Sequence, residues 1–277
     1  MKTIKQLINF ILFSNIYVAL GAFFLCISSA IELNLNNNYS YTVLCFFSTL
    51  FIYNTQRIFY KKNDYTIPQS IRRKWISENR FIVLLLITLS FIGIIVSLFF
   101  VSKLIFIYFI PVFLLSVAYF FPTIELRKNA FLKQLILVFV WTVTTAVFPM
   151  ILYKTSHIKE IDLLFFISRF CFMAAICLPF DIRDLTIDAT DKTLTIPQLI
   201  GERKTKIIAG IFALIYLTIE LILYQNEFIS FSTCSIHFIT ALIVLGLLLL
   251  KSKNEYVYTL GLDGTMILNG LLLFLFN

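Results

Sequence analysis

The sequence has little charge for its length. Charged residues make up only 14% of the 277 positions, whereas hydrophobic residues make up 60% and the mean hydropathy is +0.91. Soluble domains carry roughly a quarter charged residues, so this chain has too little polar surface to remain in water. The composition therefore excludes a soluble globular protein and indicates a membrane protein.

Cysteine and histidine are also scarce, which argues against redox and zinc chemistry. The 5 Cys residues lie in apolar stretches, and no two of them form a C-x-x-C pair. We interpret them as small packing residues rather than as disulfide or metal ligands. The 2 His residues, His157 and His237, lie far apart in the sequence and do not suggest a metal site.

Apolar runs long enough to cross a bilayer recur from one end of the chain to the other. In lipid such segments must be helices, because no water is available to satisfy free backbone groups. We therefore predict an all-α bundle of nine transmembrane helices within a single membrane-embedded domain, residues 1–277. The predicted spans are Gln6–Ile31, Tyr39–Tyr60, Phe81–Val101, Leu104–Phe121, Phe131–Tyr153, Ile161–Asp181, Ile207–Tyr224, Phe228–Leu250 and Tyr256–Phe276.

The net charge of +8 would fit a nucleic-acid-binding protein, but its distribution argues against one. If the N-terminus is cytoplasmic, all Lys and Arg residues except four fall in cytoplasmic segments. The exceptions are Lys103, Lys154 and Lys159 on the opposite side and Arg169 within a span. This is the positive-inside pattern of membrane proteins. We expect a bacterial inner-membrane protein with a cytoplasmic N-terminus, a C-terminus on the opposite side and no nucleic-acid partner.

Two cytoplasmic loops are long, residues 61–80 and 182–206, whereas the loops on the other side are short. Because binding residues concentrate on loops held by a rigid scaffold, we place the function on the cytoplasmic side. In the first loop, Ile71 and Trp75 fall on one side of a helix and Arg72 on another. This amphipathic segment predicts either an interfacial helix or a basic lid over an anionic substrate.

Three carboxylates mark the end of the sixth predicted span. Asp181, Asp184 and Asp188 are spaced i, i+3 and i+7, which places them on one face of a helix. Like charges on one face repel each other unless a cation neutralises them, and hard oxygen ligands suit Mg²⁺. The spacing predicts a Mg²⁺–diphosphate site, although an acidic, solvated helix end is the alternative interpretation.

This segment resembles a known motif. Asp181, Asp184 and Asp188, followed by Thr195-Ile196-Pro197 and Gly201, resemble the second motif of the UbiA superfamily of intramembrane prenyltransferases. That motif reads Asp-x-x-Asp-x-x-x-Asp, with a Thr-Leu-Pro-like element seven residues later and then a Gly. The nine predicted spans also agree with the family fold. The connection between the fourth and fifth spans shows a weaker likeness at Tyr119, Pro122, Arg127 and Lys133.

The resemblance implies a membrane enzyme that moves an isoprenyl group from its diphosphate to a membrane-soluble acceptor, an aromatic compound or a lipid. It implies Mg²⁺ as the cofactor, with Asp181, Asp184 and Asp188 as metal-binding and catalytic residues. It also makes Arg127 and Lys133 candidates for binding the diphosphate.

The first aspartate motif of that family is missing. It should close the second span, but its three acidic positions fall here on Thr55, Ile58 and Lys62. Instead, Asn54, Arg57 and Lys61 share one helix face, and we hypothesise that they bind the diphosphate directly. The alternative is a positive flank that has lost its metal site. The competing function is therefore a catalytically impaired family member that binds an isoprenoid or lipid without transfer.

Several other polar residues lie within predicted spans. A lone charge in lipid is unfavourable, so we expect Arg169 and Glu220 to form an ion pair. A further set lines the central chamber or forms hydrogen bonds between helices. These residues are Asn9, Asn15, Asp263 and Asn269.

Overall fold

The computed structural model describes residues 2–35, 40–59, 71–103, 105–120, 129–153, 160–190, 193–251 and 254–276. Nearly all of these residues are helical, and they include no strand. The helices are α1 (Lys2–Phe13), α2 (Ile16–Glu32), α3 (Ser40–Phe59), α4 (Ile71–Glu78), α5 (Arg80–Leu98), α6 (Ile105–Phe120), α7 (Ala130–Thr142), α8 (Phe148–Tyr153), α9 (Glu160–Arg183), α10 (Leu185–Thr190), α11 (Ile196–Ile200), α12 (Glu202–Gln225), α13 (Phe231–Leu249), α14 (Glu255–Tyr258) and α15 (Gly264–Phe276).

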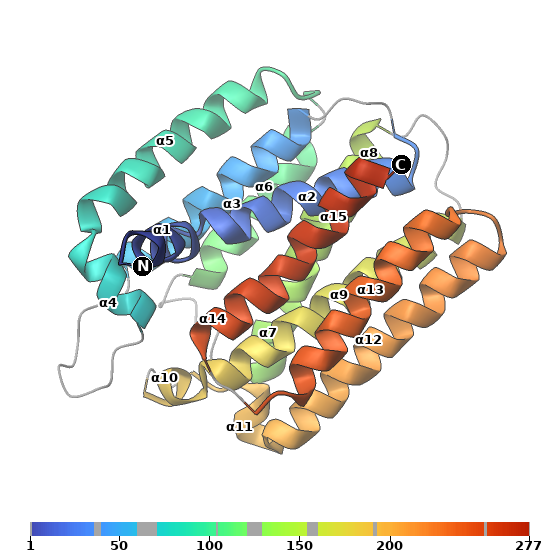
Figure 1. Cartoon of the computed structure of the whole chain (residues 1–277). Helices are drawn as coiled ribbons and strands as arrows, with labels where there is room; N and C mark the ends of the chain where they lie inside the picture. Colours follow the sequence, from blue (N-terminus) through green and yellow to red (C-terminus); the bar gives the residue numbers. More distant parts are fainter. Residues whose placement is uncertain are drawn as a thin grey trace.

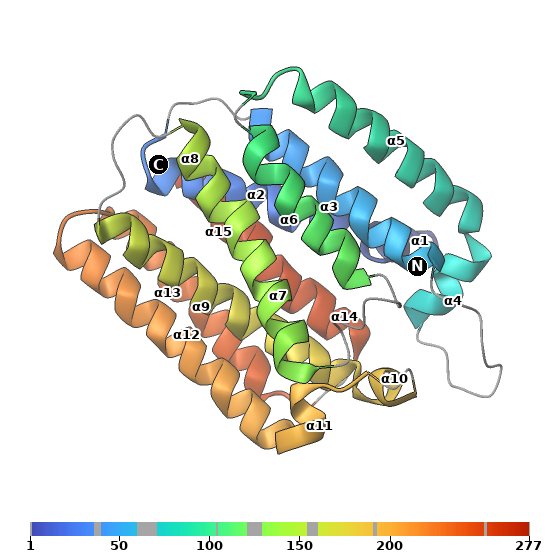
Figure 2. The ribbon, with the colours of Figure 1, turned by 180° about the vertical axis from the view of Figure 1, so that it is seen from behind.

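The long helices form a ring. α3 packs on α2, α2 on α15, α15 on α13, α13 on α12, α12 on α9 and α9 on α7. α6 contacts both α7 and α3 and so closes the ring, while α5 packs on α3 from outside (Figures 1 and 2). The short helices α4, α10 and α11 gather at one end of the bundle. The ring encloses a central region, and α4 at this end contributes Arg72 to the wall of the cavity within it.

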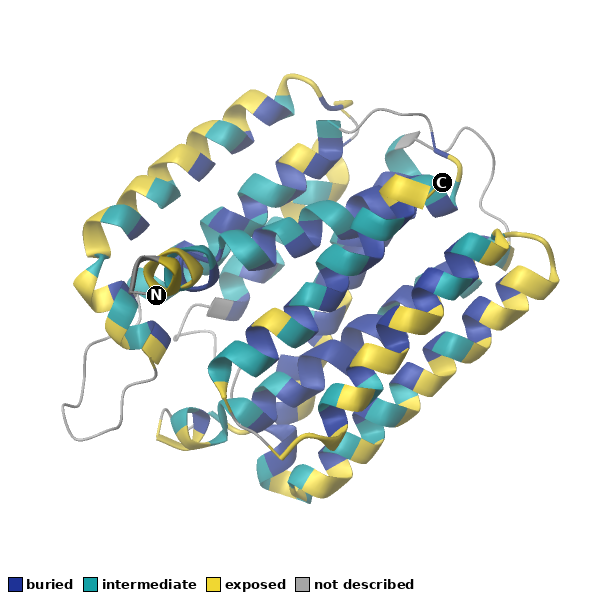
Figure 3. Cartoon of the chain, viewed as in Figure 1, coloured by how far each residue is buried: buried dark blue, intermediate teal, exposed yellow. Residues whose placement is uncertain are grey.

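The outer surface of the ring is apolar and much of its polar content is inside. Large side chains such as Leu84, Phe91 and Leu242 are about half exposed, whereas Asn54 and Glu220 are buried. Figure 3 shows exposed positions along the outer faces of the long helices and buried ones in the middle of the bundle. A soluble protein instead surrounds its apolar core with a surface rich in exposed charge, which the outer faces of these helices lack. The protein is an integral membrane protein.

The length and hydropathy of the helices support several membrane spans. Six described helices are long and apolar enough to cross a bilayer, or seven if the bent pair α1–α2 forms one span. The shorter apolar segment Ile105–Tyr119 lies in α6, and α3 has 20 residues. The predicted all-α membrane bundle is confirmed, and the count of nine spans stays a prediction.

The first predicted span, Gln6–Ile31, is not one straight helix. α1 and α2 meet at an angle of 61°. Asn15, at the break, has the left-handed backbone conformation with φ of 63°, which asparagine adopts more readily than most residues. The break turns the Asn15 side chain toward α3, where it donates a hydrogen bond to Asn54 Oδ1 at 3.0 Å.

Two segments are wound as π-helices, Val143–Val147 after α7 and Thr259–Asp263 between α14 and α15. Such wide turns are rare and occur frequently at functional sites. Thr259 and Asp263 of the second segment face the central cavity described below. The wide turn therefore coincides with the placement of a buried carboxylate toward the interior of the bundle.

Candidate functional site

A central cavity of about 910 Å³, part of it open to solvent, lies inside the ring. Its wall comes from α1–α4, α6, α7, α9, the second π-helical segment and α15. The C-terminal end of α9 contributes Phe180, Asp181, Arg183 and Asp184, so the aspartate motif borders this cavity.

The cavity wall carries three basic and three acidic side chains. They come from α3, α4, the end of α9 and the second π-helical segment. These residues are Arg57, Arg72, Arg183, Asp181, Asp184 and Asp263. Their formal charges sum to zero, so the wall itself does not compensate the charge of an anionic ligand. Its arginines nevertheless offer planar donor groups suited to phosphate oxygens.

The three predicted metal ligands do not point at one centre. Lys133 of α7 donates to Asp181 Oδ1 at 2.8 Å and to Asp188 Oδ2 at 3.0 Å, and all three side chains are buried. Asp188 does not line the cavity. Asp184 accepts two hydrogen bonds from Arg183, each of 2.7 Å. The repulsion that suggested a divalent ion is therefore already compensated by Lys133 and Arg183.

The remaining donor atoms fit Mg²⁺ in part. Asp181 Oδ2 is buried and has no hydrogen-bond partner among the described residues, which is unusual for a carboxylate oxygen and makes it a candidate ligand atom. Asp181, Asp184 and Asp263 carry oxygen ligands of the kind that Mg²⁺ prefers on the wall of one cavity, but among the described residues these three do not bring ligand atoms within 4.8 Å of one another. Asp188 accepts a hydrogen bond from Lys133 and does not line the cavity, so of the three predicted metal ligands it is the least suited to bind Mg²⁺.

Of the predicted diphosphate-binding residues, Arg57 lines the cavity. Asn54 does not; it is fully buried and donates to the Ser14 carbonyl at 2.9 Å, which holds α3 against the break between α1 and α2. Lys133 lies between the aspartates, as described above. Lys61 and Arg127 lie outside the described residues. The role of these residues in binding diphosphate remains a prediction.

Arg72 brings the amphipathic segment into the site. Its guanidinium forms an ion pair of 2.9 Å with Glu255 and donates to Thr259 Oγ1 at 3.0 Å, and the residue lines the cavity. Trp75 of the same helix packs edge-on against Phe10. The segment therefore places one arginine on the cavity wall, and its role as an interfacial helix or as a basic lid stays a prediction.

The charged side chains on the cavity wall shift one another's pKa values. Burial raises the pKa of the Asp184 carboxyl, but the adjacent Arg183, together with Arg72 and Arg57, outweighs burial and lowers the pKa to about 2. Burial and the nearby charge of Arg183 lower the pKa of the Arg72 guanidinium. Asp184 is therefore a carboxylate at neutral pH, which is the form that binds a cation.

A second, apolar cavity of about 710 Å³ lies beside the first, between α3, α6 and α7. The two cavities share Tyr53, Tyr119, Leu137 and Trp141. Trp141 Nε1 donates to the Tyr53 hydroxyl at 3.2 Å, and their rings meet edge to face. The paired aromatic rings thus stand at the boundary between a charged compartment and an apolar one.

Sequence reasoning missed some of this site. Arg183 and Asp263 contribute charge to the cavity but were not predicted to bind substrate or metal, whereas Arg72 belongs to the segment for which a basic lid was one of two interpretations. Asp263 could be found from the sequence, because it was one of the polar residues expected to line the central chamber. Asn15 was another, and both line the cavity. The other two in that group make hydrogen bonds between helices: Tyr256 donates to Asn9 at 2.6 Å, and Asn269 donates to Tyr216 at 3.4 Å.

The predicted ion pair between Arg169 and Glu220 is wrong. Arg169 Nη2 lies 3.2 Å from Glu32 Oε1, while Glu220 forms a hydrogen bond with Ser168 and faces His237. Glu32 is the last residue of α2, and nothing in its sequence context showed that it would reach α9. The partner was decided by packing across the ring.

Comparisons with known proteins identify the fold. No protein-family profile matches the chain. No curated protein matches it either. A solved structure from work on digeranylgeranylglyceryl phosphate synthase is similar with a TM-score of 0.59 and 14% identity, covering 99% of this chain and 98% of that one. The apo structure of a UbiA homolog from Aeropyrum pernix K1 is similar with a TM-score of 0.56 and 10% identity, covering 93% and 94%.

Both likenesses extend over almost the whole of each chain. The protein therefore has the fold of the UbiA superfamily of membrane prenyltransferases, and the fold implied by the aspartate motif is confirmed. At this level of identity a shared fold does not by itself carry a shared activity. The activity has to be argued from the residues of the two cavities.

Proposed function

We propose that the protein transfers an isoprenyl group from its diphosphate to a membrane-soluble acceptor, either an aromatic compound or a lipid. One observation carries this proposal. A cavity lined by three arginines and three aspartates lies beside an apolar cavity, and the two share a pair of aromatic rings. The two compartments match a ligand with a polyanionic head and a hydrocarbon tail.

The arginines are suited to the diphosphate. Arg57, Arg72 and Arg183 reach the cavity from α3, α4 and α9, so they approach a bound ligand from different directions. Arg183 Nη1 is buried and has no hydrogen-bond partner among the described residues. A buried guanidinium donor of this kind gains most from a charged acceptor, and Arg forms paired contacts with phosphate oxygens.

The aspartates are suited to a cation that accompanies the diphosphate. Because the charges of the wall balance without a ligand, the negative charge of a diphosphate would be uncompensated if it entered alone. Asp181 and Asp184 would offer carboxylate oxygens to Mg²⁺ beside it, and because the acidic side chains here do not converge on one point, the diphosphate itself would supply further oxygen ligands. When bound, this ion would offset the charge that develops on the departing diphosphate.

The transfer breaks the bond between the first isoprenyl carbon and the diphosphate oxygen, and the electron pair leaves with the diphosphate. A nucleophilic atom of the acceptor then bonds to the allylic carbon and gives up its proton. Tyr53 and Trp141, between the two cavities, present aromatic rings that stabilise positive charge on that carbon. The apolar cavity between α3, α6 and α7 takes the hydrocarbon tail and limits its length.

Purified protein with Mg²⁺, radiolabelled isoprenyl diphosphates and a mixture of quinone-precursor and lipid acceptors tests the proposal. We expect Arg72→Gln and Asp184→Asn to lower turnover by about 10²–10³-fold, the usual effect of removing one charged stabilising group. Arg203→Gln removes the same charge from an exposed site and serves as the control. Equal turnover in all three variants would refute the assignment of the site.

The apolar cavity has its own test. Val112 of α6 lines it, and Val112→Phe would fill part of its volume. We expect this variant to favour shorter isoprenyl diphosphates over longer ones while the affinity for diphosphate itself is unchanged. An unaltered preference for chain length would place the tail elsewhere.

Two observations favour a second candidate function, binding of an isoprenoid or lipid without transfer. Lys133 forms ion pairs with Asp181 and Asp188, and the first aspartate motif is missing. The same experiment separates the two functions. Mg²⁺-dependent release of diphosphate that is lost in Asp184→Asn supports the enzyme, whereas saturable binding with no release at any Mg²⁺ concentration supports the second function.

A further inference from the structure

A second group of charged side chains lies inside the bundle and does not line either cavity. Glu32, Arg169, Glu220 and His237 come from α2, α9, α12 and α13, and each is at most 8% exposed. Arg169 precedes Asp181 by about 18 Å along α9, at about 1.5 Å per residue. The group is therefore well separated from the aspartate motif, and the function proposed above does not use it.

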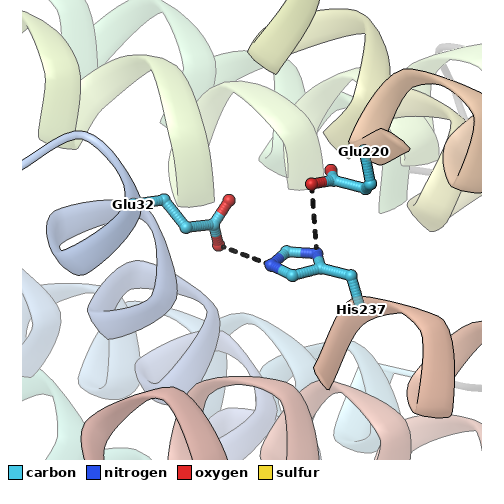
Figure 4. Close-up of side chains that lie close together, drawn as sticks. All are labelled: Glu32, Glu220 and His237. Carbon is cyan, nitrogen blue, oxygen red and sulfur yellow. Dashed lines mark ion pairs between the residues drawn. The ribbon is translucent and has the colours of Figure 1, made fainter. Parts of the chain in front are cut away.

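Two carboxylates and one imidazole of this group lie close enough to share an ion. Glu32, Glu220 and His237 each offer one ligand atom, and the three atoms are within 4.8 Å of one another. In Figure 4 the two carboxyl groups approach the His237 ring from different helices. Around a four-coordinate Zn²⁺ ion the ligand atoms are roughly 3.3–3.6 Å apart, because the bonds to nitrogen and oxygen are about 2.0–2.2 Å long. The soft terminal torsion of a glutamate side chain covers the remaining difference.

Each of these three side chains is held at one atom and has no partner at another. Glu32 Oε2, Glu220 Oε2 and His237 Nε2 are buried and have no hydrogen-bond partner among the described residues. The other oxygen or nitrogen of each group is hydrogen-bonded to a neighbour. These neighbours are Ser28 and Arg169 for Glu32, Ser168 for Glu220 and Tyr216 for His237. Metal sites use such outer partners to orient their ligands, whereas a buried polar atom with no partner is otherwise unusual.

The His237 ring has the spacing expected of a metal ligand. A proton on Nδ1 that is donated to the Tyr216 hydroxyl leaves the lone pair on Nε2, where it can bind an ion. In the other tautomer, Nε2–H would face Glu32 Oε1 at 3.5 Å, which is longer than the roughly 2.7–3.2 Å of an N–H···O hydrogen bond. The spacing therefore suits an ion between the nitrogen and the carboxylate better than a hydrogen bond.

The charge of the group also favours a cation. Glu32 and Glu220 carry two negative charges and Arg169 carries one positive charge, so one negative charge is uncompensated within the group. An unpaired charge inside a membrane bundle is unfavourable. A divalent ion with a hydroxide as its fourth ligand brings the total charge to zero. A proton would balance the charge as well, and the metal content of the protein separates the two.

We propose that Glu32, Glu220 and His237 bind a divalent transition-metal ion of the Zn²⁺ type, which joins α2, α12 and α13 inside the bundle. Imidazole suits Zn²⁺, whereas Mg²⁺ prefers oxygen ligands, so this site and the aspartates select different ions. Nothing in the order of residues pointed to this site, because its ligands lie on three helices that are far apart along the chain.

Metal analysis of the unaltered chain tests the proposal. Protein purified in detergent without a histidine tag is treated with a chelator, reloaded with Zn²⁺ and washed. We expect one Zn²⁺ to be retained per chain and the Tm to rise, because an ion that binds only the folded state stabilises it. Excess Mg²⁺ and the substitution Asp184→Asn should leave this ion in place, so the result does not depend on the proposed transfer. A wild-type chain that retains no Zn²⁺, or that loses it to Mg²⁺, would overturn the proposal.

Matched variants locate the ion. His237→Gln removes the nitrogen ligand, and Glu220→Gln removes an oxygen ligand. Their controls are His157→Gln, at the other histidine of the sequence, and Glu227→Gln, at an exposed glutamate. We expect Zn²⁺ to be lost from the first two variants and kept in the two controls. Equal retention in all four would show an adventitious ion only and would refute the site.

Tyr216→Phe tests the site even if the ligand variants do not fold, because it removes one hydroxyl and keeps every ligand atom. Losing the partner of His237 Nδ1 should weaken the affinity for Zn²⁺ by about 10–100-fold, the usual effect of removing a hydrogen bond to a metal ligand. Competition with a chelating dye measures this affinity. An affinity equal to that of the wild type would mean that His237 does not bind the ion.

Discussion

Replacing Lys133 with methionine removes the cation between Asp181 and Asp188 while keeping most of the side-chain volume. Lys133 Nζ makes two charge-assisted hydrogen bonds, of 2.8 and 3.0 Å, and its side chain is 6% exposed. Removing one partner of such a buried pair costs about 3–5 kcal/mol, because it leaves charge without compensation. The carboxylates can then avoid this cost only by taking up a proton or another cation.

The assay is thermal unfolding in detergent with and without Mg²⁺. A loss of 3–5 kcal/mol corresponds to a fall in Tm of roughly 6–20 °C for a chain of this size. If Mg²⁺ binds Asp181, added Mg²⁺ should restore part of the Tm of Lys133→Met and change that of the wild type less. The restoration follows from preferential binding of the ion to the folded state.

Lys74→Met is the matched control, because the Lys74 side chain is 71% exposed and its ion pair with Glu78 spans 4.0 Å. It should change the Tm by little, since exposed ion pairs contribute at most about 1 kcal/mol. If Lys133→Met unfolds at the wild-type temperature, Lys133 does not hold the two carboxylates together. If its Tm falls and Mg²⁺ has no effect, Asp181 and Asp188 form a structural site and not a metal site.

Two further predictions concern packing and pH. A Cβ atom at Gly270 would lie 1.9 Å from the carbonyl oxygen of Phe24. Gly270→Ala should therefore separate α15 from α2 and lower the free energy of unfolding by about 1–3 kcal/mol. Gly246→Ala is the control, because a Cβ atom there meets nothing within 4 Å, and it should be neutral or stabilising in thermal unfolding. The ion pair with Arg183 lowers the pKa of Asp184 from 3.8 to about 2, so its stabilisation is present above the ordinary pKa and is lost as the pH falls toward 2. The difference in Tm between wild type and Asp184→Asn should therefore shrink over that interval, and a constant difference would contradict the assignment.

The sequence alone determined the class of structure. Apolar runs of the length of a bilayer can satisfy their backbone groups only as helices, so composition was enough to predict an α-helical membrane bundle. The spacing of Asp181, Asp184 and Asp188 identified the UbiA-type fold, because a local motif on one helix is readable from the order of residues. The break at Asn15 escaped prediction, since asparagine in a left-handed conformation is not visible in hydropathy.

Only the tertiary structure decided which side chains meet across the ring. Lys133 lies far from Asp188 in sequence and yet binds it, so the repulsion expected from the motif by itself is neutralised by α7. Likewise, Arg169 forms its ion pair with Glu32 of α2 and not with Glu220, and both carboxylates lie close to the ring of His237. Partners of this kind depend on the order of helices around the bundle and on their rotation. In lipid the hydrophobic pattern constrains that rotation weakly, because the outer faces of all these helices are apolar alike.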